Sequence, residues 1–295
     1  MISLVITSFK EPELVQKAIA AILDNPIKEE YELLVAAPDK ETEIIVNKIA
    51  KQHPQVKYVK DPGKGKSYAL NLIFKELQGR IWIFTDGDVY IEKNAVNKLI
   101  EAFDDELVGC ASGRPVSTNP KNNMLGFWSH LLYDAGAHQI RKELSKKNQF
   151  LECSAYLFAF KDNITRNIPL NVAEDAIIPY LTMKKGYKIR YVEDALVYVK
   201  NPTTIKDFIK QRVRTAKAHE TLEDYAPFFP KVKSFSNEVK KGSKWALQYP
   251  RKFTEYLWTF ALFATRLFIW LNVIWDDRVV KKRYGDAWER IESTK

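Results

Sequence analysis

The sequence has little cysteine: Cys110 and Cys153 are the only two among 295 residues. Two cysteines are too few for a disulfide scaffold, and their spacing fits no zinc-binding pattern. We therefore expect two partly buried free thiols in a reducing compartment. The sequence also lacks an internal repeat and a low-complexity linker. Residues 1–9 read as a strand without the basic leader of a signal peptide, so we expect no signal peptide.

The net charge of +9 favours an anionic partner, such as a diphosphate, nucleic acid or an acidic membrane. The positive charge is spread along the chain and no nucleic-acid reader motif occurs, so nucleic acid is disfavoured. Aromatic residues make up 13% of the chain, which argues against disorder. The length allows one large α/β domain with an appendage, or two small domains.

The first hundred residues alternate between short β-rich runs and amphipathic helical patterns. Strands are expected at residues 2–7, 31–36, 56–59 and 81–85, with helices from Pro12 and at residues 42–51 and 67–77. This alternation predicts an α/β fold with a Rossmann-like, mostly parallel sheet and helices on both faces. Ligands of such sheets bind beyond the carboxyl ends of the strands.

The pattern changes after residue 103. Strands are expected at residues 108–116, 150–160 and 188–199, and helices at 122–142, 175–184 and 208–222. The only plausible domain boundary is near residue 222, where prolines and a Lys/Ser-rich stretch precede a hydrophobic segment. We predict a nucleotide-sugar-binding catalytic domain at residues 1–222 and a helical, membrane-associating region at residues 223–295.

Two carboxylates follow the predicted strand at residues 81–85, in the run Asp86-Gly87-Asp88. Acids two positions apart in a turn can converge on one hard cation. Mg²⁺ and Mn²⁺ suit such a pair, because Mg²⁺ uses one or two protein carboxylates together with substrate phosphates. The alternative is an ordinary Asp-Gly turn with solvated acids.

A lysine-containing loop at residues 61–67 lies between a predicted strand and a helix. A Gly-rich loop at a helix N-terminus offers N–H groups and a positive dipole end to phosphate. Gly65-Lys66-Ser67 resembles the end of an ATP-binding P-loop, but Lys60 stands where that motif needs glycine. An ATPase is therefore disfavoured, whereas a plain solvated loop remains an alternative.

Several motifs in order resemble inverting family 2 glycosyltransferases of the GT-A fold, the group that holds cellulose, chitin and hyaluronan synthases and dolichyl-phosphate sugar transferases. The resemblance covers about residues 1–220 and includes residues 5–11, Asp39, 65–71, 86–88, 174–175 and 211–214. It implies that Thr7, Glu11 and Asp39 contact the nucleotide and that Lys66 faces the diphosphate. Asp39 departs from the family pattern, because Ala-Ala-Pro-Asp stands where Asp-Asp-Gly-Ser is usual.

The same resemblance implies that Asp86 and Asp88 hold the metal and that Asp86 also borders the nucleotide. Glu174-Asp175 matches an acidic pair whose second member is the catalytic base, although acids at this position are also ordinary at a helix start. Gln211 and Arg214 match a box that assists the diphosphate. Thr215 stands where that box carries tryptophan, so processive synthesis is not expected.

The resemblance therefore implies an inverting, metal-dependent hexosyltransferase that uses a UDP- or GDP-linked sugar. The acceptor is a hydroxyl or phosphate, on a glycan or on a polyprenyl- or dolichyl-linked molecule. One alternative is a catalytically inactive protein of the GT-A fold. Another is a sugar nucleotidylyltransferase, whose Gly-rich, Arg-containing N-terminal loop is absent at residues 7–10.

The hydrophobic segment at residues 256–275 is long enough to span a bilayer, but Arg266 near its middle makes insertion costly. Its polar residues fall in one sector, which favours a helix lying in the membrane interface with Trp258, Trp270 and Trp275 near headgroups. A true span and a helix buried in the protein or in a dimer remain alternatives. We expect attachment at the cytosolic face, aided by basic residues that flank both ends of the segment.

Overall fold

The computed structural model describes residues 1–227, 242–276, 285 and 291–294. Its strands are β1 (Ile2–Thr7), β2 (Tyr31–Ala37), β3 (Val56–Lys60), β4 (Ile81–Asp86), β5 (Val89–Ile91), β6 (Val108–Ser117), β7 (Leu157–Lys161) and β8 (Lys188–Val199). The principal helices are α1 (Pro12–Leu23), α2 (Lys40–Ala50), α3 (Lys66–Ile73), α4 (Ala95–Glu101), α5 (Met124–His130), α6 (Gln139–Lys146), α7 (Glu174–Lys184), α8 (Ile205–Glu220), α10 (Ser243–Gln248) and α11 (Phe253–Trp275). A π-helix, η2 (Leu131–His138), joins α5 to α6, and short 3-10 turns occur at Ala102–Asp104, Thr221–Asp224 and Glu292–Thr294.

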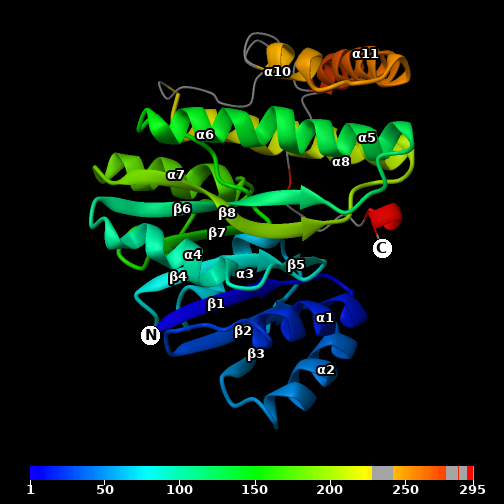
Figure 1. The fold of residues 1–295 in the computed structure, drawn as a ribbon. Coiled ribbons are helices and arrows are strands. Elements are labelled where there is room, and N and C mark those ends of the chain that lie inside the picture. The colour runs from blue at the N-terminus through cyan, green and yellow to red at the C-terminus, as the bar shows by residue number, and fades with distance from the viewer. Residues whose placement is uncertain (228–241, 277–284, 286–290, 295) are drawn as a thin grey trace.

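The strands form one mixed sheet in the order β3-β2-β1-β4-β7-β6-β8-β5 (Figure 1). The predicted parallel arrangement is confirmed for β1 to β4, in which β1 pairs in parallel with both β2 and β4. β7 runs antiparallel to β4 and β6, and β5 runs antiparallel to β8. An α/β fold with a mostly parallel core is thus present, and the antiparallel strands extend it.

Strand β4 shows why the sequence is apolar without alternation at this point. Ile81 and Ile83 belong to the core beneath α1, α2 and α4, whereas Trp82 and Phe84 belong to the core beneath α3, α6 and α7. All four side chains are buried, because helices cover both faces of the sheet. Aromatic rings concentrate in the second core, where Phe84 stacks on Phe160 with centroids 5.3 Å apart.

The expectation of a strand at residues 150–160 is correct only for its last part, because β7 begins at Leu157. Residues 151–153 are irregular and buried, and they lie beside the start of α7. The backbone N–H of Cys153 donates to the carbonyl of Asp175 at 2.9 Å, so it is bonded to the first turn of α7 and not to a neighbouring strand. Both cysteines are free thiols, as expected, and they are fully buried with their sulfurs 3.4 Å apart.

Helix α11 packs against α8 and α5 above the sheet, and a third apolar core lies between them (Figure 1). Leu262, Ile269 and Val273 are buried there. The ion pair of Lys217 with Asp276 adds a polar link between α8 and the end of α11. Trp270 is also buried in this core, so the expectation that it lies near lipid headgroups is wrong.

The opposite face of α11 is apolar and exposed. Its exposed large side chains are Phe253, Tyr256, Leu257, Phe260, Leu267, Phe268, Leu271, Ile274 and Trp275. The polar sector faces the other way, because Thr259 is fully buried and Glu255, Arg266 and Asn272 are half-buried. By length and composition, α11 is the one helix in the described part of the chain that could cross a membrane.

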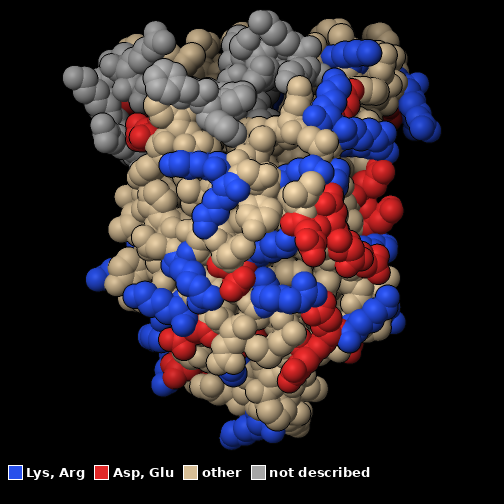
Figure 2. Space-filling view, turned by 90° about the vertical axis from the view of Figure 1, so that its left-hand side faces the viewer, with Lys and Arg blue, Asp and Glu red and all other residues tan. Residues whose placement is uncertain are grey.

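The basic residues that flank α11 are only partly described. Lys244, Arg251 and Lys252 lie within the structure, whereas Lys240, Lys241, Arg278, Lys281, Lys282 and Arg283 lie outside the described residues. On the face shown in Figure 2, Lys and Arg side chains are interspersed with Asp and Glu. The face in Figure 2 therefore carries no single continuous basic patch of the kind that binds nucleic acid.

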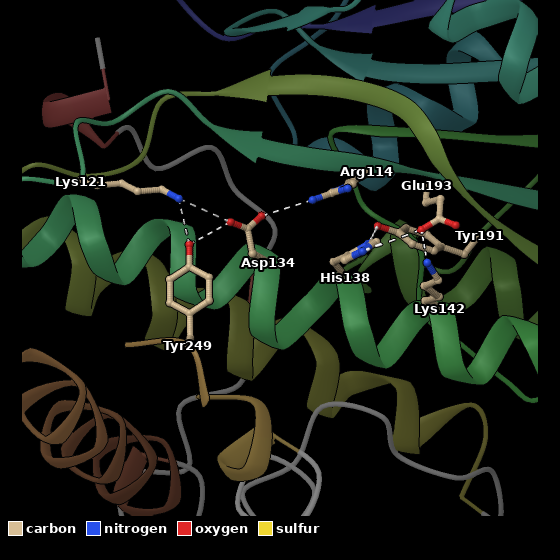
Figure 3. Close-up of polar contacts among 8 residues, drawn as sticks. All are labelled: Arg114, Lys121, Asp134, His138, Lys142, Tyr191, Glu193 and Tyr249. Carbon is tan, nitrogen blue, oxygen red and sulfur yellow. Dashed lines mark hydrogen bonds and ion pairs between the residues drawn. The ribbon is translucent and has the colours of Figure 1, made fainter. Parts of the chain in front are cut away.

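A polar network joins the segment before α11 to the π-helix (Figure 3). The hydroxyl of Tyr249 donates to Asp134 Oδ2 at 2.9 Å and accepts from Lys121 Nζ at 3.1 Å, and Arg114 lies 3.5 Å from Asp134 Oδ1. Burial and the Asp134 carboxylate raise the pKa of Tyr249 above its usual range, so its hydroxyl remains a donor. The C-terminal region predicted at residues 223–295 thus contacts the rest of the described chain through both polar and apolar side chains.

Candidate active site

The carboxyl ends of β1 and β4 place Thr7 beside Asp86. The two residues are partners in the parallel register, and Thr7 Oγ1 donates to Asp86 Oδ1 at 3.0 Å. Backbone N–H of Gly87 donates to the Thr7 carbonyl at 2.9 Å, which fixes the turn after β4 against β1. The motif at residues 5–11 and the predicted metal motif at residues 86–88 therefore meet at the edge of the sheet where ligands of parallel sheets bind.

Gly87 lets the acidic turn approach α1 closely. A Cβ at this position would lie 2.7 Å from Val15 Cγ2 and 2.9 Å from Ser8 Cβ, so any side chain would push the turn outward. Burial, together with the charges of Asp86 and Glu11, raises the pKa of Asp88 to about 7. The charges of Asp86 and Glu11 thus act on Asp88 in this acidic corner, and the ammonium of Lys66 offsets them only in part.

A divalent cation fits the chemistry of this corner. Burial and the charges of Asp86 and Glu11 disfavour the ionised form of Asp88 and so raise its pKa, and a bound cation would favour that form. Within the described residues, no group of three or more His, Cys, Asp or Glu side chains is placed to hold a metal by itself. Two protein carboxylates completed by substrate phosphates are the arrangement that Mg²⁺ uses.

Lys66 is the first residue of α3 and follows Gly65, whose φ of 108° few other residues adopt. Its Nζ lies 2.8 Å from Asp86 Oδ1 and 2.6 Å from Glu174 Oε1. Burial alone would lower the pKa of Lys66, but the two carboxylates raise it well above its usual range, so the ammonium is always charged. The second lysine of this loop is thus not a solvated side chain, because it bridges two motifs, whereas Lys64 in the same loop is exposed.

Glu174 and Asp175 open helix α7, but neither is its cap. The N-cap position is Ala173, and no side chain makes a capping hydrogen bond there. Glu174 reaches Lys66, whereas Asp175 Oδ2 lies 3.6 Å from Nε2 of His219 on α8. Burial raises the pKa of Glu174, with the charge of Lys66 opposing this effect. The two neighbouring acids therefore have different partners and different environments.

Asp39 has a structural role at the start of α2. Its Oδ1 accepts from the backbone N–H of Thr42 at 2.9 Å and from Thr42 Oγ1 at 2.7 Å. Its Oδ2 accepts from the backbone N–H of Lys10 at 2.9 Å. These bonds lower the pKa of Asp39 despite partial burial, and they tie the loop after β1 to α2. A carboxylate has further lone pairs, so a contact with a nucleobase is compatible with this role.

Three residues near the acidic corner are absent from the sequence-based expectation: Tyr133, Tyr156 and Arg212. The two tyrosine rings meet edge to face with centroids 6.4 Å apart. Burial and the nearby charge of Asp88 raise the pKa of Tyr156, while the charge of Arg212 opposes this. Arg212 adjoins Gln211 in the box at residues 211–214, and Gln211 and Arg214 themselves lie half-buried on α8.

A family model described as "Glycosyl transferase family 2" matches residues 3–167, and one described as "Glycosyl transferase family group 2" matches residues 141–280. The chain is 22% identical over 252 residues to the N-acetylglucosaminyltransferase of Rhizobium meliloti (80% of this chain, 59% of the relative). It is 27% identical over 242 residues to the poly-beta-1,6-N-acetyl-D-glucosamine synthase of Staphylococcus epidermidis (79% and 58%). The chain therefore spans a little under three fifths of these relatives.

Two solved structures share the fold. The mannosyltransferase PcManGT from Pyrobaculum calidifontis, in complex with GDP-Man and Mn²⁺, superposes with a TM-score of 0.65 at 17% identity, over 95% of this chain and 88% of that one. S. aureus TarS 1-349, in complex with UDP-GlcNAc, superposes with a TM-score of 0.51 at 14% identity, over 93% and 80%. At these identities the likeness establishes the fold alone.

Proposed function

The chain belongs to glycosyl transferase family 2, and we propose that it transfers a hexose from a nucleoside diphosphate sugar to an acceptor, with inversion at the anomeric carbon. One observation carries the proposal: Lys66 bridges Asp86 and Glu174. That bridge brings the phosphate-binding loop, the metal motif and the base-bearing helix to one point. The family membership and the fold support the coarser statement, and the geometry supports the division of roles below.

The nucleotide side of the site is assigned to the carboxyl ends of β1 and β2. Thr7, Glu11 and Asp39 would border the nucleotide, with Asp39 holding the loop after β1 in place. Lys66 would neutralise the diphosphate, and Gln211 and Arg214 on α8 would assist it. The bound nucleotides of the two structural relatives, GDP-Man and UDP-GlcNAc, make UDP- and GDP-linked sugars the first donors to test.

Asp86 and Asp88 would hold Mg²⁺ or Mn²⁺. When bound, the cation would absorb negative charge on the leaving diphosphate. Mn²⁺ accompanies GDP-Man in PcManGT, which supports the choice of metal. The uncompensated carboxylate of Asp88 supports the position.

Asp175 is the proposed base. It takes the proton from the acceptor hydroxyl while the acceptor oxygen bonds to the anomeric carbon, and the bond from that carbon to the diphosphate breaks on the opposite side. A general base must come within hydrogen-bond reach of the proton that it removes. Asp175 is the better choice of the acidic pair, because Glu174 is engaged by Lys66 at 2.6 Å.

The acceptor is proposed to be lipid-linked, with the protein attached to the cytosolic face of a membrane. The support is α11, which turns its polar sector toward the catalytic domain and exposes a row of large apolar side chains. Trp275 and Tyr256 on this face suit the interface, where aromatic residues concentrate. Thr215 stands where processive members carry tryptophan, so we propose that a single sugar is transferred.

The test is the release of nucleoside diphosphate from a panel of nucleotide sugars that includes UDP-N-acetylglucosamine and GDP-mannose, with and without Mn²⁺. The proposal expects Mn²⁺-dependent release from one member and none from Asp88→Ala. Release of pyrophosphate from a nucleoside triphosphate and a sugar phosphate would point instead to a nucleotidylyltransferase. Binding of nucleotide sugars without release from any of them would point to an inactive binding protein.

A further inference from the structure

A buried imidazole lies directly behind Asp175. His219 Nε2 lies 3.6 Å from Asp175 Oδ2, and His219 Nδ1 lies 3.0 Å from Glu152 Oε2. The exposed fractions of His219, Glu152 and Asp175 are 6%, 4% and 8%. Because buried polar side chains are costly unless they have partners, we treat these three neighbouring groups as a single unit.

The backbone around Glu152 is fixed on both sides. Arg141 donates from Nε to the Glu152 carbonyl at 2.9 Å and from Nη2 to the Cys153 carbonyl at 3.0 Å. Backbone N–H of Cys153 donates to the carbonyl of Asp175 at 2.9 Å. The segment that carries Glu152 is therefore tied to the first turn of α7, which carries the proposed base.

The two acids at the start of α7 are held by different partners. Glu174 contacts Lys66 and faces the metal motif, whereas Asp175 contacts His219. His219 comes from α8, the helix that also carries Gln211 and Arg214. The position of Asp175 thus depends on a side chain from the helix that carries the proposed diphosphate-binding box.

We propose that His219, which lies between Glu152 and Asp175, is a positioning residue that orients the Asp175 carboxylate toward the acceptor hydroxyl; this rests on the proposed function. The two ring nitrogens of the imidazole lie near different carboxylates, so the ring is packed between Glu152 on one side and Asp175 on the other. A carboxylate accepts several hydrogen bonds, so the contact with His219 is compatible with a role as base. Orientation by a supporting shell of this kind is what a precise base requires.

The experiment compares wild type with His219→Ala, His219→Gln and Glu152→Gln, measuring nucleoside diphosphate release from the active nucleotide sugar with Mn²⁺. His219→Ala should lower kcat by about 10²-fold with KM for the nucleotide sugar changed less than about twofold, because misplacing a catalytic group by about 1 Å has a cost of that size. His219→Gln places an amide nitrogen near the Nε2 position and should recover much of the loss. The kcat of Glu152→Gln should lie between the kcat of His219→Gln and that of His219→Ala.

A double-variant cycle separates positioning from a structural role. If His219 acts through Asp175, then Asp175→Asn with His219→Ala should be no slower than Asp175→Asn alone. His138→Gln is the matched control, since His138 is a buried histidine whose partners are Tyr191 and Glu193 instead (Figure 3). It should leave kcat within about twofold.

The outcomes distinguish this inference from the function on which it rests. If wild type releases no nucleoside diphosphate from any member of the panel, the proposed function fails and this inference fails with it. If Asp175→Asn is inactive while folded His219→Ala and His219→Gln retain wild-type kcat, only this inference is overturned. Additive losses in the double variant, or a loss confined to KM, would also overturn it. The melting temperature of each variant identifies any that do not fold. If His219→Ala does not fold, the kcat values of His219→Gln and Glu152→Gln test the positioning role.

Discussion

Lys66 Nζ lies 2.6 Å from Glu174 Oε1, which joins the first residue of α3 to the first residue of α7. These residues are more than a hundred positions apart in the chain, and no local pattern connects them. The contact turns three separate motifs into one site and leaves Asp175 to a different partner. The predictions below test this division of roles.

Lys66→Ala should weaken the binding of a nucleoside diphosphate by about 10- to 100-fold and leave the binding of the nucleoside nearly unchanged. The reason is that a hydrogen bond to a charged group contributes about 1.5 to 3 kcal/mol, whereas the nucleoside carries no phosphate. Calorimetric titration with UDP and uridine, or with GDP and guanosine, measures both. Lys64→Ala is the control, because Lys64 is exposed in the same loop and stacks on Tyr68. Equal losses for nucleoside and diphosphate in Lys66→Ala would indicate a structural role.

Asp88→Asn should abolish transfer and yet stabilise the metal-free protein above neutral pH. The pKa of Asp88 is about 7 in the folded chain and near 3.8 when unfolded, so the folded state binds the extra proton between these values. Its contribution to stability therefore falls as pH rises from about 4 to 7 and stays low above 7. The variant should gain at most about 4 kcal/mol at pH 8, and the gain should vanish below pH 4. Urea denaturation in the presence of a chelator measures this.

Asp105→Asn is the control for the urea denaturation experiment, because it should change the stability of the folded protein in the opposite direction. A backbone hydrogen bond from Leu107 and the charges of Lys188 and Arg190 lower the pKa of Asp105, so its carboxylate stabilises the folded chain at neutral pH and loses this effect in acid. Asp105→Asn should therefore destabilise the protein slightly at pH 8. A destabilised Asp88→Asn at that pH would contradict the account of an uncompensated acidic corner.

Asp175→Asn should lower turnover by about 10² to 10⁴-fold while the affinity for nucleoside diphosphate stays near wild type. Asparagine has nearly the same shape but cannot accept the proton from the acceptor. Glu174→Gln is the informative comparison, because it should weaken the hold on Lys66 and so alter diphosphate binding as well as turnover. Near-normal turnover of Asp175→Asn would assign the base elsewhere.

Replacing Leu257, Phe260 and Phe268 together by Gln should release the protein from anionic liposomes, because these side chains lie on the exposed face of α11. Burial of apolar surface in the interface is worth about 25 cal/mol for each Å². Salt should only weaken the attachment of wild type, since basic residues add a screened attraction. Ile44→Gln with Leu107→Gln is the matched control, because both side chains are exposed and neither lies on α11. Flotation with liposomes measures binding, and unchanged flotation of the triple variant would refute membrane attachment through α11.

The local sequence pattern was sufficient to predict the positions of elements with a regular pattern of buried residues. β1, β4 and β8 match the expected ranges to within a residue. β1 and β4 are buried on both faces and apolar without interruption, whereas β8 mostly alternates between buried and partly exposed side chains. β5 and α4 were not expected: β5 spans only three residues and α4 only seven, too short for a clear period. The antiparallel direction of β7 could not be read either, because strand direction depends on which neighbour a strand pairs with, not on its own residues.

Candidate site residues could be named from the sequence where a motif is contiguous, but not where a site depends on long-range contacts. Asp86 and Asp88 could be proposed because they stand two positions apart at the end of a strand. Glu152 and His219 could not, since nothing near either residue indicates a partner, and the structure alone brings them to Asp175. Trp270 shows the reverse error: its place in an apolar run suggested lipid, but packing against α8 decides its environment.

The bridge made by Lys66 also couples the binding of the diphosphate to that of the cation. Its single positive charge is shared between the carboxylates of Asp86 and Glu174, so these three groups together keep a net negative charge and a diphosphate that arrives alone is repelled. A diphosphate that arrives with a divalent cation, or after one, instead meets balanced charge. By linkage, each of the two must raise the affinity of the other by the same factor. The cation and the nucleotide should therefore bind cooperatively, and free nucleotide should be a poor inhibitor until the cation is present.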